Sequence, residues 1–399
     1  MADIDKLVSS YKSEMIKTMS DIIAIPAIAP SAGGKGESKR ADFVERKLNE
    51  LGLHARRFDY KDETGTVRSN LVAKHGNSKS TIWLLSHLDT VSPGDLSLWR
   101  HDPFDAYVES GRLYGRGSSD NGQGIVSSLF AAKALLESKA NTRYNIGLAF
   151  VADEETGSKY GVIKLLKEGI FGKNDLMIVP DWGTEKGNAI EIAEKGILWL
   201  KFKVVGKQVH ASTPQLGINA YRVSILLLSR LDELLHKKYA LRNKLFEPPF
   251  STFEMTKHEA NVDSTNIVPG TETFYMDCRV LPNYSLDSIT RDIRNEAKQI
   301  AKSTHAKISI SVVSREDPAK PVPSSSPIIK LLSKSIERVK RANAKLVGIG
   351  GGTVAKYFRD AGLPAAVWAT LPDNAHQPNE YLVIEDMVND AKVLANVFL

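Results

Sequence analysis

The chain has 399 residues, of which 42% are hydrophobic and 25% charged, and this balance excludes an intrinsically disordered protein. Its 28 glycines and 17 prolines follow no fixed repeat, so a collagen-like or low-complexity chain is also excluded. The net charge of +6 comes without any long basic run, which indicates neither a nucleic-acid nor a membrane partner.

The single cysteine, Cys278, rules out an intramolecular disulfide and a thiolate zinc site, because both need at least two cysteines. Any bound metal must therefore use histidine and carboxylate ligands. The first residues, Met1–Lys6, carry acidic groups and lack the apolar segment of a signal peptide, and no stretch is long enough to span a bilayer. We therefore expect a cytoplasmic protein.

The first part of the chain predicts an α/β domain. Apolar residues on one face indicate a helix over Ile4–Ile25, which Pro26 ends. Short apolar strands then alternate with helices, which is typical of a mostly parallel sheet with helices on both faces. The predicted helices are Arg40–Leu51, Gln123–Glu137 and Tyr160–Glu168, and the predicted strands are Asn70–Lys74, Thr81–Leu85, Asn145–Val151 and Leu176–Val179.

The pattern changes after Gly196. Strands with one exposed face now occur in the order strand, helix, strand, strand, helix, strand, which predicts a two-layer, ferredoxin-like α+β domain. The predicted strands are Ile197–Val205, Thr252–Lys257, Glu272–Leu281 and Lys307–Val313, and the helices are Ile218–His236 and Leu286–Lys302.

A segment rich in proline and serine, Ser314–Pro327, reads as a linker to a second stretch of α/β pattern. We therefore predict one catalytic domain in two pieces, residues 1–196 and 314–399, with residues 197–313 inserted as a lid and dimerisation domain. The last piece contains the predicted helices Ile328–Val339 and Ile384–Val397, the strand Ala365–Ala369 and a glycine run at Gly348–Gly352.

Acidic and histidine side chains follow the predicted strands of the catalytic domain. In an open α/β sheet, ligands bind at the carboxyl ends of the strands, so these side chains are candidates for one common site. Asp120 differs, because it lies in a glycine-rich turn that opens a helix. The candidates are His87 and Asp89, Asp120, the run Asp153–Glu155, Asp181 and His376.

If each of these five places supplies one ligand, the set contains two imidazoles, three carboxylates and no sulfur. Such a set suits Zn²⁺, Co²⁺ or Mn²⁺. This set is too large for one catalytic zinc and suits two ions that share a carboxylate. Asp89 points to the same side as His87 on an extended chain, so its carboxylate is expected to accept the other N–H of that histidine.

Each candidate also has an ordinary structural explanation. His87 and Asp89 form a short motif that occurs by chance, and His376 by itself carries no signal. Adjacent glutamates often begin a solvated helix, and Asp120 could cap the helix that follows it. Asp181 could be a turn residue. Only the joint placement of these residues favours a site.

At these residues the chain resembles the dinuclear-zinc aminoacylase and carboxypeptidase family, which includes acetylornithine deacetylase, succinyl-diaminopimelate desuccinylase and glutamate carboxypeptidase. The resemblance extends from Ile25 to Leu382, and several motifs carry it in order along the chain. They are Ser86–Val91, Trp99 with Asp102–Phe104, Leu113–Asp120 and Asp153–Ser158.

The resemblance implies a role for each candidate residue. Asp120 would bridge the two metals, with His87 and Asp181 on one ion and Glu155 and His376 on the other. Glu154 would act as the general base, which takes a proton from a metal-bridging water and delivers it to the leaving amine.

The same resemblance extends to the inserted domain. His210, within Gly206–Pro214, would reach the active site of a neighbouring subunit and hydrogen-bond the developing oxyanion, which implies a homodimer through this domain. Asn266 and Arg279 would anchor the terminal carboxylate of the substrate. From the residues alone, His210 and Arg279 could equally be exposed strand residues.

The residues Gly351, Gly352 and Thr353 resemble the substrate loop of the family, but the chain then departs from the pattern. Desuccinylases continue with Ser-Asp-Gly/Ala-Arg, whereas this chain continues Val354-Ala355-Lys356-Tyr357. Lys356 is the one residue here that could supply a replacement charge. The departure concerns the acyl group that is accepted and leaves the metal ligands untouched.

These observations predict a metal-dependent hydrolase of an amide bond, with two divalent ions, Zn²⁺ ahead of Co²⁺ or Mn²⁺, and a small substrate that has a free carboxylate. An N-acyl-amino-acid deacylase of the desuccinylase or deacetylase type and a metallo-carboxypeptidase or dipeptidase both fit the family. A non-catalytic binding protein on the same scaffold is the alternative from another class.

Overall fold

The computed structural model describes residues 3–399. Contacts divide the chain into two compact units. The first unit contains the residues up to Ile192 together with Val322–Val347 and Thr353–Leu399, and the second contains Ala193–Pro321 and Gly348–Gly352. None of the helices in residues 3–399 combines the length and the apolar character that a membrane span requires.

An eight-stranded sheet organises the first unit, with the strand order β1-β2-β6-β3-β7-β16-β8-β15. The neighbours β6, β3, β7 and β16 run parallel, whereas β1, β2 and β8 join the sheet antiparallel. The fold is therefore α/β with a parallel centre. The strands are β1 Arg56–Lys61, β2 Val67–His75, β3 Thr81–His87, β6 Asn145–Val151, β7 Leu176–Gly183, β8 Ala189–Glu194, β15 Lys345–Ile349 and β16 Ala365–Ala369.

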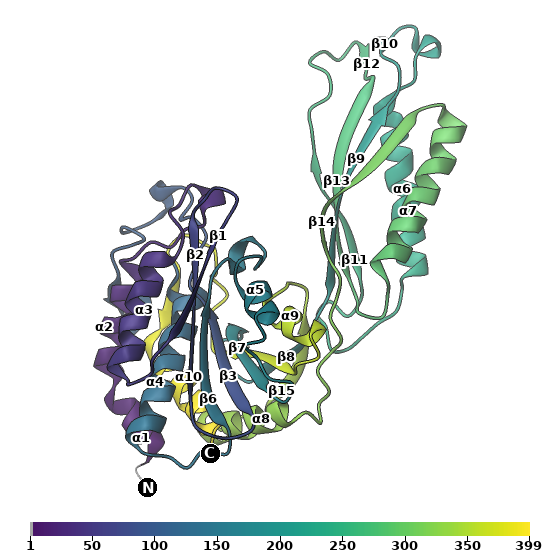
Figure 1. Ribbon diagram of the computed structural model, residues 1–399. Helices are drawn as coiled ribbons and strands as arrows, with labels where there is room; N and C mark the ends of the chain where they lie inside the picture. The colour runs from purple at the N-terminus through teal and green to yellow at the C-terminus, as the bar shows by residue number, and fades with distance from the viewer. Residues whose placement is uncertain (1–2) are drawn as a thin grey trace. The chain divides into compact units, whose positions relative to one another are not determined.

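Helices cover both faces of the parallel strands, which explains why β3 and β6 are buried along their whole length. On one face, Trp83 and Leu85 pack against Leu165 of α5 and Phe358 of α9. On the other face, α4 contacts β3, β6 and β7 and packs against α10 (Figure 1). The helices of this unit are α1 Ile4–Ser10, α2 Lys12–Ile23, α3 Ser38–Glu50, α4 Gln123–Glu137, α5 Val162–Lys167, α8 Pro327–Lys340, α9 Ala355–Asp360 and α10 Ile384–Asn396.

The second unit has two layers. Its four-stranded antiparallel sheet has the order β11-β13-β9-β14, and α6 and α7 pack on one face of it (Figure 1). Every second residue of β9 and β13 is buried, and Phe202 stacks on Phe274 in the core between sheet and helices. The elements are β9 Gly196–Val205, α6 Ala220–Lys238, β11 Thr252–His258, β13 Thr271–Val280, α7 Leu286–Thr304 and β14 Lys307–Glu316.

Short elements complete both units. A pair of two-residue strands, β10 Val209–His210 and β12 Ile267–Val268, lies in the second unit. In the first unit, β4 Tyr107–Glu109, β5 Arg112–Tyr114 and β17 Tyr381–Val383 form a small antiparallel sheet.

The predicted helix Ile4–Ile25 is in fact two helices, α1 and α2, that meet at Tyr11. The N–H of Tyr11 donates to the carbonyl of Val8, a tighter bond than that of an α-helix, and this ends α1. The Tyr11 hydroxyl donates to Glu137, and its ring packs on Phe130 of α4. Tertiary contacts to α4 therefore accompany a break in a helix that periodicity alone predicts as continuous.

Candidate metal centre

The parallel strands bring the predicted ligands to one edge of the large sheet. His87 is the last residue of β3, Asp181 lies near the end of β7, and Glu155 follows β6. His376 lies in the loop between β16 and β17. Asp120 lies in the turn Ser118–Gly122, which directly precedes α4. Carboxyl ends of parallel strands meet at the same edge, so five residues spread over most of the chain converge.

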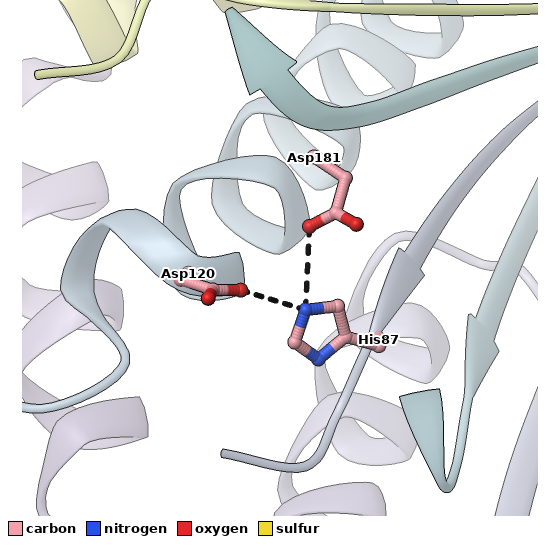
Figure 2. A group of neighbouring side chains, drawn as sticks. All are labelled: His87, Asp120 and Asp181. Atoms are coloured by element: carbon pink, nitrogen blue, oxygen red, sulfur yellow. Dashed lines mark hydrogen bonds and ion pairs between the residues drawn. The ribbon is translucent and has the colours of Figure 1, made fainter. Parts of the chain in front are cut away.

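Three of these side chains form a first cluster around His87, which is 2% exposed (Figure 2). Its Nε2 lies 2.8 Å from Oδ1 of Asp120 and 3.3 Å from Oδ1 of Asp181. A single ring N–H can make one well-aligned hydrogen bond. Here, however, two carboxylate oxygens face the same ring nitrogen. A divalent ion would bind all three atoms at once.

A second cluster forms around His376. Its Nε2 lies 3.0 Å from Oδ2 of Asp120 and 3.1 Å from Oε2 of Glu155. The side chain of His376 is 53% exposed, in contrast with the buried His87. The second cluster is therefore built on loops and reaches solvent, whereas the first rests on two strands.

Asp120 belongs to both clusters, and each of its oxygens faces a different histidine. This is the arrangement that a carboxylate bridging two cations requires. The donors are imidazole nitrogens and carboxylate oxygens alone, a set that fits Zn²⁺, Co²⁺ or Mn²⁺. The residues present therefore fit two divalent ions.

The carboxylates alter the proton affinity of both histidines. Hydrogen bonds to Asp120 and Glu155 raise the pKa of His376 to about 10. Burial by itself would lower the pKa of His87, but Asp181 and Asp120 outweigh burial and raise that pKa well above its usual value. Both rings therefore hold a proton near neutral pH, and a metal ion would have to displace it.

Glu154 lies beside the two clusters without belonging to either ligand set. Burial, reinforced by the nearby carboxylate of Asp181, raises its pKa well above the usual value for glutamate. A raised pKa suits a group that must accept a proton and later give it away.

Asp89 has a different contact from the one expected. The Nδ1 of His87 lies 2.9 Å from the backbone carbonyl of Asp89, and the Asp89 carboxylate is farther away, at 3.6 Å. That carboxylate instead accepts the backbone N–H groups of Glu154 and Glu155, at 3.0 and 3.2 Å. Asp89 thus orients His87 through its main chain and the two glutamates through its side chain.

The turn that carries Glu154 and Glu155 is fixed from a second side by Asp153, a buried residue with a left-handed φ of 66°. The Asp153 carboxylate accepts hydrogen bonds from Arg68 at 3.1 Å and from the backbone N–H of Tyr160 at 3.0 Å. The Arg68 guanidinium also donates to Glu37, and both of these side chains are buried.

The other predicted residues lie in the second unit, or next to it in the sequence. His210 and Asn266 are neighbours there, because the backbone N–H of Ala211 donates to the Asn266 carbonyl at 2.9 Å. The Arg279 guanidinium donates to both oxygens of Asp277 and to the carbonyl of Gly350, so it is already held by protein groups.

The segment after the glycine run leads into α9, and the side chains of Lys356 and Tyr357 there both have partners. Lys356 pairs with Asp360 one turn along the helix, so the expected replacement charge is already neutralised. Tyr357 stands where the desuccinylase pattern has arginine, and its hydroxyl donates to the carbonyl of Gly157 at 3.1 Å. Thr353 accepts the backbone N–H of Ala355 at the start of α9.

Sequence reasoning missed two residues that contact the site, Arg116 and Glu380. Both are 1% exposed, and they form a buried ion pair, with 2.6 Å between Nη1 and Oε2. Only a weak indication of either residue is present in the sequence. Arg116 lies between two glycines shortly before Asp120, and Glu380 comes four residues after His376.

A family model for peptidase family M20/M25/M40 matches residues 83–399. The chain belongs to this family. Members use divalent metals, and the two clusters give this chain candidate ligands for them. The protein is a metallohydrolase of the M20 type, so the enzyme class expected from its sequence is confirmed.

The proteins that resemble this chain have names that describe several different activities. An uncharacterized metallohydrolase of Methanocaldococcus jannaschii is 42% identical over 96% of this chain and 98% of its own length. A succinyl-diaminopimelate desuccinylase of Rickettsia bellii is 26% identical, with 92% of each chain covered. The structure of an M20 family metallo-carboxypeptidase from Sulfolobus solfataricus matches with a TM-score of 0.76 at 21% identity, over 96% of this chain and 98% of that one. These M20 relatives establish the family and the fold, while substrates differ among them.

Zinc binding to protein that has been stripped of metal by a chelator is expected to release protons. Near neutral pH both histidines are protonated, because their pKa values are raised, and an ion must displace those protons. The apparent affinity should therefore rise with pH, by about tenfold per unit for each displaced proton, until the His376 pKa of about 10 is passed.

Calorimetry in buffers of different ionisation enthalpy measures this proton count. The variant His258→Ala removes an exposed histidine of the second unit and should leave the count unchanged. Zinc binding with no proton release would show that the two histidines are not the ligands.

Proposed function

We propose that the protein hydrolyses the amide bond of a small N-acyl amino acid with a free carboxylate, using two divalent ions held by His87, Asp181, Asp120, Glu155 and His376. The arrangement of Asp120 carries this proposal, because each of its oxygens faces a separate histidine and carboxylate. The family and the donor set support zinc as the native ion.

Once bound, the two ions would supply a water that ionises near neutral pH and a cation that polarises the amide carbonyl. The protein must then move the protons. Glu154 takes the proton of the attacking water on its carboxylate and delivers it to the nitrogen of the leaving amine as the C–N bond breaks. The fixed backbone at Glu154 and Glu155 holds the base in place during both transfers.

His210 is proposed as the donor to the developing oxyanion, acting in the active site of a partner subunit in a homodimer. Its Nδ1 accepts the backbone N–H of Ser212 at 3.0 Å, which leaves the proton of the neutral ring on Nε2. A neutral histidine with its proton on Nε2 is a hydrogen-bond donor of the kind that the reaction needs. Asn266, which neighbours His210, and Arg279 are proposed to bind the substrate carboxylate, with Gly351, Gly352 and Thr353 lining the substrate loop.

The acyl group is proposed to be uncharged. A succinyl group would bring a second carboxylate, and Lys356 already pairs with Asp360. Tyr357 replaces the arginine of the desuccinylase pattern and is a neutral side chain. Hydrolysis of dipeptides or of a C-terminal residue is the second candidate, which the resemblance in fold to a metallo-carboxypeptidase favours.

Substrate choice is tested with purified, zinc-loaded enzyme and matched N-acetyl amino acids, N-succinyl amino acids and dipeptides. We expect hydrolysis of the N-acetyl compounds, with a lower kcat/KM for the N-succinyl ones, and loss of activity when the carboxylate is amidated. Cleavage of dipeptides alone would replace the deacylase by the peptidase. Two bound ions with no turnover on any compound would favour a binding protein on this scaffold.

The variant Glu154→Gln tests the general base. It should keep both ions, because Glu154 is in neither ligand set, while kcat falls by about 10²- to 10⁴-fold through loss of proton transfer. Metal content is measured after desalting and turnover by amine release. In the matched variant Glu155→Gln, one ligand is lost, so metal content should fall as well. Turnover close to that of the wild type in Glu154→Gln would assign the base elsewhere.

The role of His210 in a partner subunit is tested by mixing two inactive variants, His210→Ala and Glu154→Gln. Mixed dimers contain one site with both wild-type residues, so about a quarter to a half of wild-type activity should return, according to how subunits combine. Subunit exchange is verified with differently tagged chains. Absence of recovery after proven exchange would place His210 in its own subunit's site or outside catalysis.

A further inference from the structure

A buried carboxylate outside the predicted ligand sets organises the turn that carries Asp120. Glu380 is 1% exposed, and its two oxygens accept five hydrogen bonds, all from donors in the segment Arg116–Asp120. The donors are Nη1 of Arg116, the backbone N–H groups of Gly117, Ser119 and Asp120, and Oγ of Ser119. Glu380 therefore fixes the backbone of Asp120 itself.

The same contacts tie this turn to the loop of His376. Arg116 donates from Nη2 to the carbonyl of Gln377 at 3.3 Å, and Ser119 donates from Oγ to Oδ1 of Asn374 at 3.0 Å. The residues on both sides of His376 are thus bonded to the turn that holds Asp120. Glu380 and Arg116 connect the candidate bridging carboxylate to the histidine of the second cluster.

The loop of His376 depends on its surroundings for its backbone conformation. His376 and Asn379 both adopt left-handed backbone conformations, with φ of 64° and 59°, which non-glycine residues hold only when their surroundings impose it. In contrast, the two other ligands of the first cluster, His87 and Asp181, lie on strands of the central sheet. Loosening the Glu380 contacts should therefore displace the second cluster before the first.

We propose that Glu380 is a positioning residue that sets the distance between Asp120 and His376 and thereby determines whether the second cluster holds its ion. This inference rests on the proposed two-ion site. It makes the second ion depend on a carboxylate that does not touch it. Residues that orient metal ligands typically change metal affinity by about 10- to 100-fold when they are replaced.

The test is zinc or cobalt titration of chelator-stripped protein with the variant Glu380→Gln. The amide keeps the size of the side chain, but it turns an N–H group toward backbone donors and removes the charge that faces Arg116. We expect the affinity for the second ion to fall by about 10- to 100-fold and the first to change by less than about threefold. After desalting, the variant should keep one ion where the wild type keeps two.

A matched control separates positioning from the loss of a buried ion pair. Glu191 is fully buried and pairs with the buried Arg359 of α9 at 2.8 Å. The variant Glu191→Gln removes a comparable buried pair and should keep both ions, even if its melting temperature falls as far as that of Glu380→Gln. Equal loss of the second ion in both variants would overturn the proposal, because general destabilisation would explain it.

A milder variant covers the case in which Glu380→Gln does not fold. Ser119→Ala deletes the hydroxyl that bonds both Glu380 and Asn374 and leaves every charge in place. It should fold and bind the second ion several-fold more weakly. Unchanged affinity for both ions in Ser119→Ala, or equal weakening of both in a folded Glu380→Gln, would overturn the proposal.

The result is separable from that for the proposed function. If the wild type binds two ions but cleaves none of the amide substrates, the proposed reaction fails while the role of Glu380 is still measured by ion content. If the wild type binds a single ion, no second ion needs positioning, and both proposals fail. If the wild type is active with two ions and Glu380→Gln retains both, only the role of Glu380 is wrong.

Discussion

The candidate site depends on one shared carboxylate. Asp120 faces His87 with one oxygen and His376 with the other, so the position of its backbone determines the geometry of both clusters at once. A side chain with two fixed partners has no freedom to compensate for a displaced main chain. This explains why the turn that carries Asp120 is so heavily bonded, with Glu380 accepting from the backbone N–H groups of Gly117, Ser119 and Asp120 itself.

The same logic extends to the other ligands, because negative charges gather at this edge of the sheet. Glu154, Glu155, Asp181 and Asp120 lie together, and their mutual repulsion opposes folding unless cations or protons offset it. Two kinds of group offset this negative charge in the protein. The histidines face the carboxylates directly. Asp89, Asp153 and Glu380 instead accept hydrogen bonds from backbone N–H groups and buried arginines. The candidate ligands thus remain available for ions, and the surrounding acids hold the chain in place.

Sequence reasoning placed the candidate ligands at one site for a physical reason that does not extend to the residues that support them. A strand of apolar residues followed by an acid or histidine is a local signal, and β3, β6 and β16 begin at the predicted residues, while α4 matches its predicted bounds. Glu380 gives no comparable signal, because its five donors lie more than 250 positions away in the chain. The same is true of the helix break at Tyr11, which follows contacts to α4, and of β8 and β15, whose pairing is not encoded in their own short segments. The Asp89 carboxylate was predicted to accept from His87, but the backbone carbonyl of Asp89 is the nearer acceptor, because spacing fixes which residues are near and not which group of each is closest.

The candidate metal ligands and the proposed substrate loop lie in different kinds of segment. Two candidate ligands, His87 and Asp181, lie on strands of the parallel sheet, Asp120 lies in the heavily bonded turn before α4, and Glu155 and His376 lie in turns that follow strands. The segment after the glycine run lies on the short helix α9, and there the chain differs from desuccinylases at each of the residues Val354–Tyr357. In this chain Val354 and Ala355 are buried, Lys356 pairs with Asp360, and the Tyr357 hydroxyl donates to Gly157. All of these are contacts within the protein. Through its bond to Gly157, Tyr357 contacts the turn that carries Glu154, so a substitution at Tyr357 is expected to act on the proposed general base as well. If Val354–Tyr357 belong to the proposed substrate loop, this contact would make the loop a constraint on the chemistry as well as on specificity.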